Sequence, residues 1–444
     1  MLVSPEDPIV ALATAPTPSA LALIRASGAG CVELLAGLVK AGERLAQAKG
    51  NTVHHCMVMD GAEAVDEVLV AVFRAPRSYT GEDAAEISCH GSLPVIRRML
   101  SLLTRSGFRQ AGPGEFTQRA FLNGKMDLTR AEAVNELVRA QTDRARDLAL
   151  QRLSGAVETK LKEARDLLID VRAAVEVQLD YPDDEIEPHA YDESVETARR
   201  ALETLFRSFR RGRLYQEGVS VAITGAPNSG KSSLFNALLK QERAIVSETP
   251  GTTRDYLEGF ISLQGIPMRL LDTAGIREAQ DPVEAEGVRK TGEVIQGAHV
   301  ILELVDSQIG IAAGRETGAR LPGIGVWTKV DLAGAKPAPE GFVPVSSITG
   351  AGIEALEDRV VSVLLSNDCE ESAQPLIDSE RQRDLLERAL ASLSRFSDGR
   401  DKGVSLDLLA VDLADALDAI GEITGEVTSA EVLERMFGSF CVGK

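Results

Sequence analysis

The sequence predicts a multidomain protein of the α/β plus α type, in which a discontinuous helical bundle carries an inserted α/β domain. Residues up to about 120 alternate strand-like apolar runs with turns, which favours an N-terminal α+β domain. Helical periodicity appears twice, before residue 217 and after residue 368. Between those segments strands alternate with helices, which is typical of a mixed, mostly parallel sheet. We expect domains at residues 1–122, 123–216, 217–367 and 368–444, the second and fourth forming one bundle.

The composition limits the classes of protein that fit. The 444 residues are enough for two or three domains, with 44% hydrophobic and 26% charged residues. A net charge of −19 repels nucleic acid, so RNA binding would need a local basic patch. We find no membrane span and no signal peptide. The cysteines form no CxxC pair, which argues against a zinc site and favours the reducing cytoplasm: Cys31, Cys56, Cys89, Cys369 and Cys441.

The N-terminal and helical elements follow from local patterns. Apolar runs at residues 19–28 and 65–76 predict strands, and residues 89–107 predict a helix that ends at Gly107. From about Met126 the chain is rich in Ala, Leu, Glu and Arg at helical spacing. The acidic stretch "DYPDDEIEP" interrupts it and is read as a solvated loop rather than a cation site, because metal-loop spacing is absent. A helix is expected again from about Tyr191 to about Gly212.

The inserted segment carries the strongest signal. Strands are predicted at residues 218–224, 268–275, 299–306, 323–331 and 342–347. Between the first strand and a helix, Gly225, Gly230, Lys231 and Ser232 fit the phosphate loop G-x-x-x-x-G-K-[ST]. The glycines let backbone N–H groups surround phosphate oxygens, Lys231 reaches the β- and γ-phosphates, and the Ser232 hydroxyl ligates Mg²⁺.

Further motifs follow in the order that a GTPase requires. "TPGTTRD" offers Thr252 and Thr253 for Mg²⁺ and the γ-phosphate, and "DTAG" places Asp272 at a strand end near Mg²⁺. In "TKVD", Asp331 can accept two hydrogen bonds from guanine N1–H and the N2 amine, which adenine lacks as a pair. Together with "SSITG", these motifs select GTP over ATP.

Two positions depart from the usual GTPase pattern. Thr328 stands where most GTPases have Asn, so we expect guanine selectivity to survive through Asp331 with the nucleotide held more weakly. Ile276 follows "DTAG" and cannot orient water, so hydrolysis needs another residue and another source of positive charge. From spacing alone the acidic candidates remain open, and each is otherwise a solvated loop residue: Glu278, Asp281, Glu284 and Glu286.

These motifs, with stretches outside the inserted domain, resemble the MnmE/TrmE family of bacterial tRNA-modification GTPases. The matching stretches are "TGEDAAEISCHG", "GPGEFTQRAFLNGKMDLTRAEAV", "DYPDDEIE" and "EITGEVTSAEVLERMFGSFCVGK". The resemblance covers essentially the whole chain. It implies a TrmE-Era-EngA-like G domain, an N-terminal domain that dimerises and binds 5-formyltetrahydrofolate or a related tetrahydrofolate, and an FAD-dependent partner, MnmG (GidA), in a heterotetramer or larger complex. The pair would add an aminomethyl or carboxymethylaminomethyl group to C5 of the wobble uridine of certain tRNAs.

The resemblance also implies the roles of individual residues. Glu284 and Lys231 would serve GTP hydrolysis, with Mg²⁺ on Ser232 and Thr253. K⁺ would be held by Asn228, Ser247, Thr249 and Thr252 in place of an arginine finger. Folate would contact Arg25, Glu86, Lys125 and Lys444. The residues expected at GTP are Asn228, Ser229, Gly230, Lys231, Ser232, Ser233, Ser247, Thr249, Thr252, Thr253, Asp272, Thr273, Ala274, Gly275, Thr328, Lys329, Asp331, Ser346, Ser347 and Ile348.

The C-terminal "FCVGK" has its own interpretation. A lipid anchor is excluded, because Gly443 and Lys444 do not fit a C-a-a-X box. Thr428 and Glu431 predict a capping box for a helix that docks the terminus, and Gly443 permits close approach. Cys441 is either a catalytic nucleophile or tRNA-facing thiol, or a small buried thiol.

Three functions remain to be separated. The first is a K⁺-activated GTPase that gates tRNA modification. The second is a ribosome-assembly GTPase switch, which shares every G motif but predicts an RNA-binding domain with a basic face. The third is a folate-dependent one-carbon transferase with G domains merely attached, which predicts activity without GTP hydrolysis. The net charge and the extra N-terminal domain oppose the second.

Overall fold

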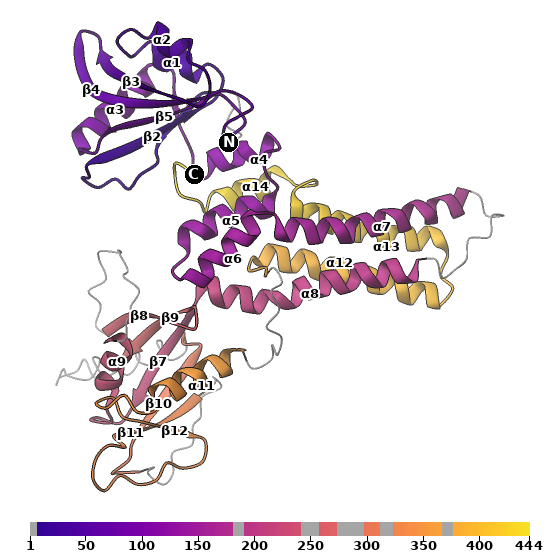
Figure 1. Ribbon diagram of the computed structural model, residues 1–444. Helices are drawn as coiled ribbons and strands as arrows, with labels where there is room; N and C mark the ends of the chain where they lie inside the picture. Colours follow the sequence, from indigo (N-terminus) through magenta and orange to yellow (C-terminus); the bar gives the residue numbers. More distant parts are fainter. Residues whose placement is uncertain (1–6, 181–190, 241–256, 273–296, 311–322, 366–375) are drawn as a thin grey trace, which may run out of the picture. The chain divides into compact units, whose positions relative to one another are not determined.

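A computed structural model describes residues 7–180, 191–240, 257–272, 297–310, 323–365 and 376–444 (Figure 1). The chain divides into two compact units. The first comprises residues 1–135, 168–185 and 392–444, and the second comprises residues 136–167 and 186–391. Among the described helices, none has the length and apolar character needed to cross a membrane.

The N-terminal domain is a six-stranded sheet in the order β3-β4-β5-β2-β1-β6, antiparallel except for the short β1–β6 pair. The predicted strands and the helix that ends before Gly107 are confirmed. The strands are β1 Ile9–Leu12, β2 Leu21–Ser27, β3 Thr52–Asp60, β4 Glu63–Phe73, β5 Ala84–His90 and β6 Arg109–Gln110. The helices are α1 Cys31–Ala36, α2 Glu43–Ala46, α3 Leu93–Arg105 and α4 Glu115–Leu122.

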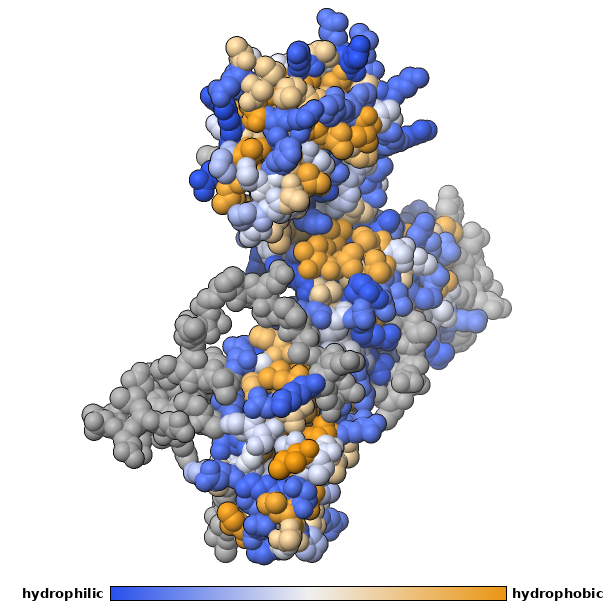
Figure 2. Space-filling model, turned by 60° about the vertical axis from the view of Figure 1, so that its left-hand side comes forward, coloured by the Kyte–Doolittle hydropathy of each residue, from blue (hydrophilic) through white to orange (hydrophobic). Residues whose placement is uncertain are grey.

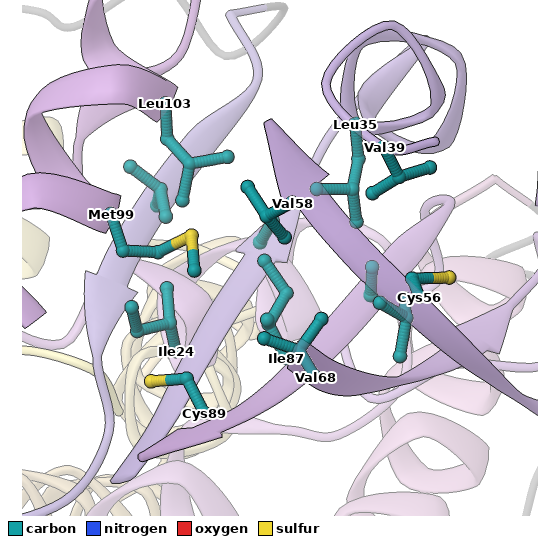
Figure 3. Close-up of a cluster of buried hydrophobic side chains, with 14 of the residues drawn as sticks. Ile24, Leu35, Val39, Cys56, Val58, Val68, Ile87, Cys89, Met99 and Leu103 are labelled. Carbon is teal, nitrogen blue, oxygen red and sulfur yellow. The ribbon is translucent and has the colours of Figure 1, made fainter. Parts of the chain in front are cut away.

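One face of this sheet forms the core of the domain. Because side chains alternate along a strand, Ile24, Val68 and Ile87 point to the same face. They meet Met99 and Leu103 of α3, both fully buried (Figure 3). The opposite face carries Arg25, Glu86 and other partly exposed side chains. Viewed from one side, hydrophilic residues cover much of the surface of the N-terminal domain, at the top of Figure 2.

The helical segments begin where the periodicity predicted them and are more divided than expected. They are α5 Leu128–Arg139, α6 Asp143–Leu153, α7 Ala156–Asp180, α8 Asp192–Glu217, α12 Glu380–Asp401, α13 Leu406–Thr424 and α14 Ala430–Phe437. The predicted end of the fourth helix near Gly212 is wrong, because α8 continues to Glu217. Gly212 is buried instead, and a Cβ there would lie 2.0 Å from the Ile377 carbonyl oxygen. Close packing, not helix termination, explains this glycine.

The inserted domain is a six-stranded sheet in the order β12-β11-β10-β7-β9-β8, parallel except for the β8–β9 pair. Strands occur in all five predicted regions, and the antiparallel edge strand β8 was not predicted. The elements are β7 Val219–Gly225, α9 Lys231–Lys240, β8 Leu257–Leu263, β9 Ile266–Asp272, β10 Val300–Asp306, β11 Gly323–Thr328, β12 Phe342–Val345 and α11 Ile353–Leu365.

Within the second unit, the β8–β9 hairpin contacts the start of α6. The Thr142 hydroxyl donates to the Gly265 carbonyl oxygen at 2.8 Å and accepts from the Ala145 N–H at 3.1 Å, which makes it the N-cap of α6. The Arg144 guanidinium lies 5.6 Å from the centre of the Tyr215 ring. The first residues of α6 are therefore fastened to the sheet of the inserted domain.

Candidate functional site

The phosphate loop joins β7 to α9 in a conformation that only particular residues adopt. Gly225 has φ +148°, Asn228 φ +62° and Gly230 φ +95°. A Cβ at Gly225 would lie 2.5 Å from the Leu304 carbonyl oxygen, so the loop requires glycine there. Left-handed residues turn successive N–H groups inward, and α9 begins at Lys231. This is the geometry of a phosphate cradle.

Of the residues expected at Mg²⁺ and phosphate, Lys231, Ser232 and Asp272 lie together at this loop, and Thr253 is outside the described residues. The Ser232 hydroxyl donates to a carboxylate oxygen of Asp272 at 3.0 Å, which joins the start of α9 to the end of β9. A hydroxyl beside a carboxylate provides the hard oxygen ligands that Mg²⁺ prefers. The Lys231 ammonium lies over the loop and donates to the carbonyl oxygens of Gly225 at 3.2 Å and Ala226 at 2.9 Å. The side chains present therefore fit a Mg²⁺-bound phosphate group.

The "TKVD" segment packs directly against the phosphate loop. Thr328 is 2% exposed, and its hydroxyl lies 2.7 Å from the Ser229 carbonyl oxygen and 3.1 Å from that of Val305. Lys329 forms an ion pair with Asp306 at 2.8 Å. Burial raises the pKa of Asp306, but the hydrogen bonds from Lys329 and from the Gln308 N–H, together with the charge of Lys329, hold that pKa below its usual value. The hydroxyl of Thr328 thus serves the fold of the loop.

The residues expected to recognise guanine follow the carboxyl ends of β11 and β12. Asp331 follows β11 on the surface, and Ser346 is buried with its hydroxyl accepting from the Thr349 N–H at 3.1 Å. Ile348 is 83% exposed beside it, an apolar surface on which a base can stack. Several predicted residues lie outside the described residues: Ser247, Thr249, Thr252, Thr253, Thr273, Ala274, Gly275 and Glu284.

A second pocket lies in the N-terminal domain, around Arg25 and Glu86. These residues are directly opposite each other in the β2–β5 pair, and their side chains form an ion pair at 2.8 Å. The Arg25 guanidinium is 5.7 Å from the centre of the Tyr79 ring and 5.8 Å from that of Phe116. A cavity of about 90 Å³ is lined by Arg25, Ala26, Ser27, Phe73, Tyr79, Thr80, Ala84, Glu86 and Phe116. Aromatic walls with one cation and one carboxylate suit a flat, polar heterocycle.

The floor of this pocket contains polar residues that the sequence analysis missed. Ser27 and Thr80 are buried, and their hydroxyls lie 2.6 Å apart, with Ser27 donating to Glu82 at 2.8 Å. Arg119, 3% exposed, forms ion pairs with Glu82 at 3.3 Å and Glu115 at 3.0 Å. Thr80, Glu82 and Arg119 lie in stretches that resemble the family, but only the folded register of β2 against the loop before β5 brings them together with Ser27.

The C-terminal tail reaches the same pocket. The Arg25 guanidinium donates to the Gly443 carbonyl oxygen at 3.3 Å, and the Phe116 N–H donates to the Lys444 carbonyl oxygen at 3.2 Å. The Gly114 N–H donates to the Cys441 carbonyl oxygen at 3.2 Å. A Cβ at Gly443 would lie 2.6 Å from the Leu12 carbonyl oxygen, which confirms that glycine permits the close approach. The Lys444 backbone is therefore at the edge of the pocket.

Two expectations about the tail need correction. The Cys441 side chain is exposed, so the interpretation of a buried thiol is wrong. The helix α14 is capped by Ser429, whose hydroxyl accepts from the Val432 N–H at 3.3 Å, and not by Thr428. The predicted docking of this helix is confirmed, because Leu433 and Phe437 are buried in one cluster with Leu128, Ala131 and Phe440, against which Phe121, Met126 and Met436 pack.

Lys125 has a different environment from Arg25 and Glu86. Its ammonium donates to the Pro76 carbonyl oxygen at 3.0 Å, and it is not among the residues that line the cavity. It lies beside Gly81, whose Cβ would meet the Lys125 side chain at 3.4 Å. Lys125 is thus fastened to the loop that supplies Tyr79 and Thr80.

A phosphate loop with a Ser–Asp pair, on a mostly parallel sheet inserted in a helical domain, defines a multidomain P-loop GTPase. The family model for the MnmE helical domain matches residues 128–441, and that for the N-terminus of the GTP-binding protein TrmE matches residues 8–125. The chain belongs to the MnmE family, GTP hydrolases that act in tRNA modification.

Relatives with the name "tRNA modification GTPase MnmE" match along their whole length. The protein from Treponema denticola is 42% identical over 99% of this chain and 98% of its own length. The protein from Carboxydothermus hydrogenoformans is 39% identical over 99% of this chain and 100% of its own length. The protein from Geobacter sulfurreducens is 40% identical over 99% of this chain and 99% of its own length. A solved structure of Era from Aquifex aeolicus is 26% identical over 39% of this chain, with a TM-score of 0.27, which is too low to add to the assignment.

Proposed function

We propose that this chain is a K⁺-activated GTPase that acts with an FAD-dependent partner of the MnmG (GidA) type. The pair adds an aminomethyl or carboxymethylaminomethyl group to C5 of the wobble uridine of certain tRNAs, in the cytoplasm. The observation that carries the proposal is the pocket of Arg25 and Glu86 reached by the chain's own tail. A GTPase that acts only as a switch does not need a second pocket for a polar heterocycle.

In the G domain, each side chain has a distinct task. Lys231 holds the β- and γ-phosphates, while Ser232 and Thr253 ligate Mg²⁺. Asn228, Ser247, Thr249 and Thr252 provide oxygen ligands for K⁺, which supplies the positive charge that an arginine finger supplies elsewhere. Glu284 positions the attacking water. The exposure of Asn228 on the phosphate loop supports its part, because its side-chain oxygen is then accessible to an ion.

In the N-terminal domain, Arg25 and Glu86 bind a tetrahydrofolate such as 5-formyltetrahydrofolate, with Lys125 and Lys444 available to its carboxylates. A guanidinium suits a carbonyl or carboxylate, and a carboxylate suits N–H donors of a pterin edge. Burial raises the pKa of the Tyr79 phenol, so it remains a neutral donor. Cys441 is exposed near the pocket and is available to the tRNA. The N-terminal domain also forms the homodimer.

The experiment compares GTP hydrolysis in K⁺ and in Na⁺, with and without 5-formyltetrahydrofolate. We expect K⁺ to raise kcat at least about tenfold, because a cation at the transition state replaces an arginine finger. Equal rates in the two salts would remove the K⁺ mechanism. In cells, Lys231→Ala should abolish wobble-uridine modification. Wobble-uridine modification that persists in the Lys231→Ala strain would contradict this proposal. It would favour a folate-dependent transferase whose G domains are not needed for the reaction.

A second experiment separates tRNA modification from a ribosome-assembly switch. Deleting the last four residues should abolish tRNA modification and leave GTP hydrolysis unchanged, because the phosphate loop and its supports lie in the inserted domain. If modification persists without them, the tail is only a packed chain end. If modification is normal and ribosomal subunits accumulate in the Lys231→Ala strain, the switch function is favoured.

A further inference from the structure

The N-terminal domain has a groove that the proposed GTP and folate sites do not use. It lies along the outer face of α3, is open to solvent and has a volume of about 390 Å³. Its lining is Arg97, Leu100, Ser101, Thr104, Arg105 and Gln110. Arginine, serine, threonine and glutamine are side chains that commonly bind nucleic-acid phosphates, and no carboxylate is part of this lining.

The charge of this groove contrasts with that of the chain. Residues 93–110 contain four arginines and no aspartate or glutamate, in a protein with a net charge of −19, but carboxylates from elsewhere in the domain pair with three of them. Arg98 pairs with Glu63, Arg105 with Asp60 and Arg109 with Glu115, so the basic character of the groove rests mainly on Arg97. Arg97 is exposed and makes no hydrogen bond or ion pair within the described part of the chain. Arg105 is 60% exposed and pairs with Asp60 at 3.0 Å. An ion pair that exposed is weak, so the guanidinium can exchange its partner for a phosphate.

The spacing of the donors favours an extended anion over a single phosphate ion. Arg97, Ser101 and Arg105 follow one another at four-residue steps, so they share one face of α3. Each step is about 6 Å along the helix axis, and the two arginines are about 12 Å apart along it. A single phosphate cannot span that distance, whereas neighbouring phosphates of a nucleic-acid strand can.

We propose that this groove binds the phosphodiester backbone of the tRNA. The chain belongs to a family of tRNA-modification GTPases, so a polyanion of this class is the substrate. The inference rests on tRNA being that substrate and not on K⁺ activation, folate or the partner enzyme. The contacts would be independent of base sequence, because phosphates carry none of it.

The position of the groove on the N-terminal domain indicates that it anchors the tRNA backbone. The inner face of α3 packs on the sheet face that carries Ile24 and Ile87, whereas Arg25 and Glu86 alternate to the other face. The groove and the pocket are therefore on opposite sides of one sheet. A tRNA held at α3 is gripped by its backbone away from the pocket, and the reacting nucleotide is a separate part of the molecule.

The test measures the binding of fluorescein-labelled tRNA to the full-length chain by anisotropy at several KCl concentrations. Each phosphate contact makes log K fall by about 0.7–0.9 per unit of log salt, which is about five- to eightfold in affinity near 0.1 M. We expect Arg97→Ala to weaken binding by about that factor and Arg97→Ala with Arg105→Ala by more. Arg97→Lys should keep most of the affinity, because it retains the charge.

A matched control is Arg44→Ala on α2, which removes an exposed arginine of the same domain that does not line the groove. It should leave tRNA affinity within about twofold, and all variants should hydrolyse GTP at the wild-type rate. Equal loss in the Arg44 and Arg97 variants would overturn the inference, as would wild-type affinity in the double variant. Absence of salt-dependent tRNA binding by the wild-type chain would also overturn it, whatever the outcome of the K⁺ and folate experiments.

Discussion

Replacing Gly443 with alanine adds a single methyl group, and we expect that group to displace the C-terminal tail from the pocket. Gly443 has φ +93°, and the added Cβ would lie 2.6 Å from the Leu12 carbonyl oxygen and 3.1 Å from the Ala13 Cα. Both are backbone atoms of a strand and the turn that follows it, so they cannot move aside as a flexible side chain would. An L-residue in such a backbone conformation also costs about 1–3 kcal/mol.

The magnitude follows from what holds the tail in place. Three hydrogen bonds join it to the N-terminal domain, from Gly114, Phe116 and Arg25. At about 1 kcal/mol each they stabilise the docked tail by about 3 kcal/mol. A strain of about 2 kcal/mol, before the steric clash is counted, lowers the ratio of docked to undocked tail about 30-fold. Most of the stabilisation of the docked state is therefore lost.

The assay is the affinity for 5-formyltetrahydrofolate by titration calorimetry, with GTP hydrolysis as a second readout. We expect Gly443→Ala to bind folate at least about tenfold more weakly and to hydrolyse GTP normally. Gly61→Ala is the matched control, because Gly61 has φ +64° and nothing within 4 Å of the added Cβ. Wild-type folate affinity in Gly443→Ala would refute the reasoning, since the tail would then contribute nothing to the pocket.

Three further changes test other parts of the structure. Ser232→Ala should raise the Mg²⁺ concentration for half-maximal GTP hydrolysis at least about tenfold, because it removes a predicted Mg²⁺ ligand. Thr328→Val should weaken binding of a fluorescent GTP analogue about tenfold, because it leaves the buried Ser229 carbonyl without this donor. Burial raises the pKa of Glu115, but hydrogen bonds led by Arg109 hold it below 4.5 in the folded protein. Its contribution to stability is present above the pKa of the unfolded state and is lost as pH falls through the lower pKa of the folded state, so Glu115→Gln should reduce the fall of the urea-unfolding midpoint on acidification.

Each of these has a contrary outcome. An unchanged Mg²⁺ midpoint in Ser232→Ala would leave its bond to Asp272 a purely structural contact. Wild-type nucleotide affinity in Thr328→Val would mean that the phosphate loop keeps its shape without the hydroxyl. If the urea-unfolding midpoint of Glu115→Gln fell in parallel with that of the wild type on acidification, other carboxylates would account for the loss of stability at low pH.

Local patterns in the sequence predicted much of the fold, because hydrophobic periodicity and the phosphate loop need only neighbouring residues. The exceptions have physical causes. Among the described strands, edge strand β8 pairs with β9 alone. The two residues between them, Gln264 and Gly265, both have positive φ and form a hairpin turn that the sequence analysis did not use. Thr428 and Ser429 are adjacent hydroxyl residues, and either can cap a helix, so geometry alone decides between them. Gly212 reads as a helix end unless its contact with Ile377 is known.

The candidate site also contains residues that the sequence predicted and residues that only the folded structure brings together. Lys231, Ser232 and Asp272 were found through motifs, and the fold brings the last two into contact. The pairing of Arg25 with Glu86 depends on the register of two strands separated by sixty residues of chain, and only a family resemblance could suggest it. Ser27 had no motif to mark it, and Arg119 lies in a stretch that resembles the family but was assigned no role, since their partners are distant in sequence.

The hydroxyl of Thr142 has a mechanical consequence. It caps α6 and at the same time holds Gly265, the residue immediately before β9, while Asp272 ends that strand beside Ser232. A strand of seven residues is close to fully extended and cannot shorten. A displacement at Asp272 along the axis of β9 would therefore also affect Gly265 and, through Thr142, the first turn of α6. β9 therefore connects the Ser232–Asp272 contact beside the phosphate loop to the start of α6.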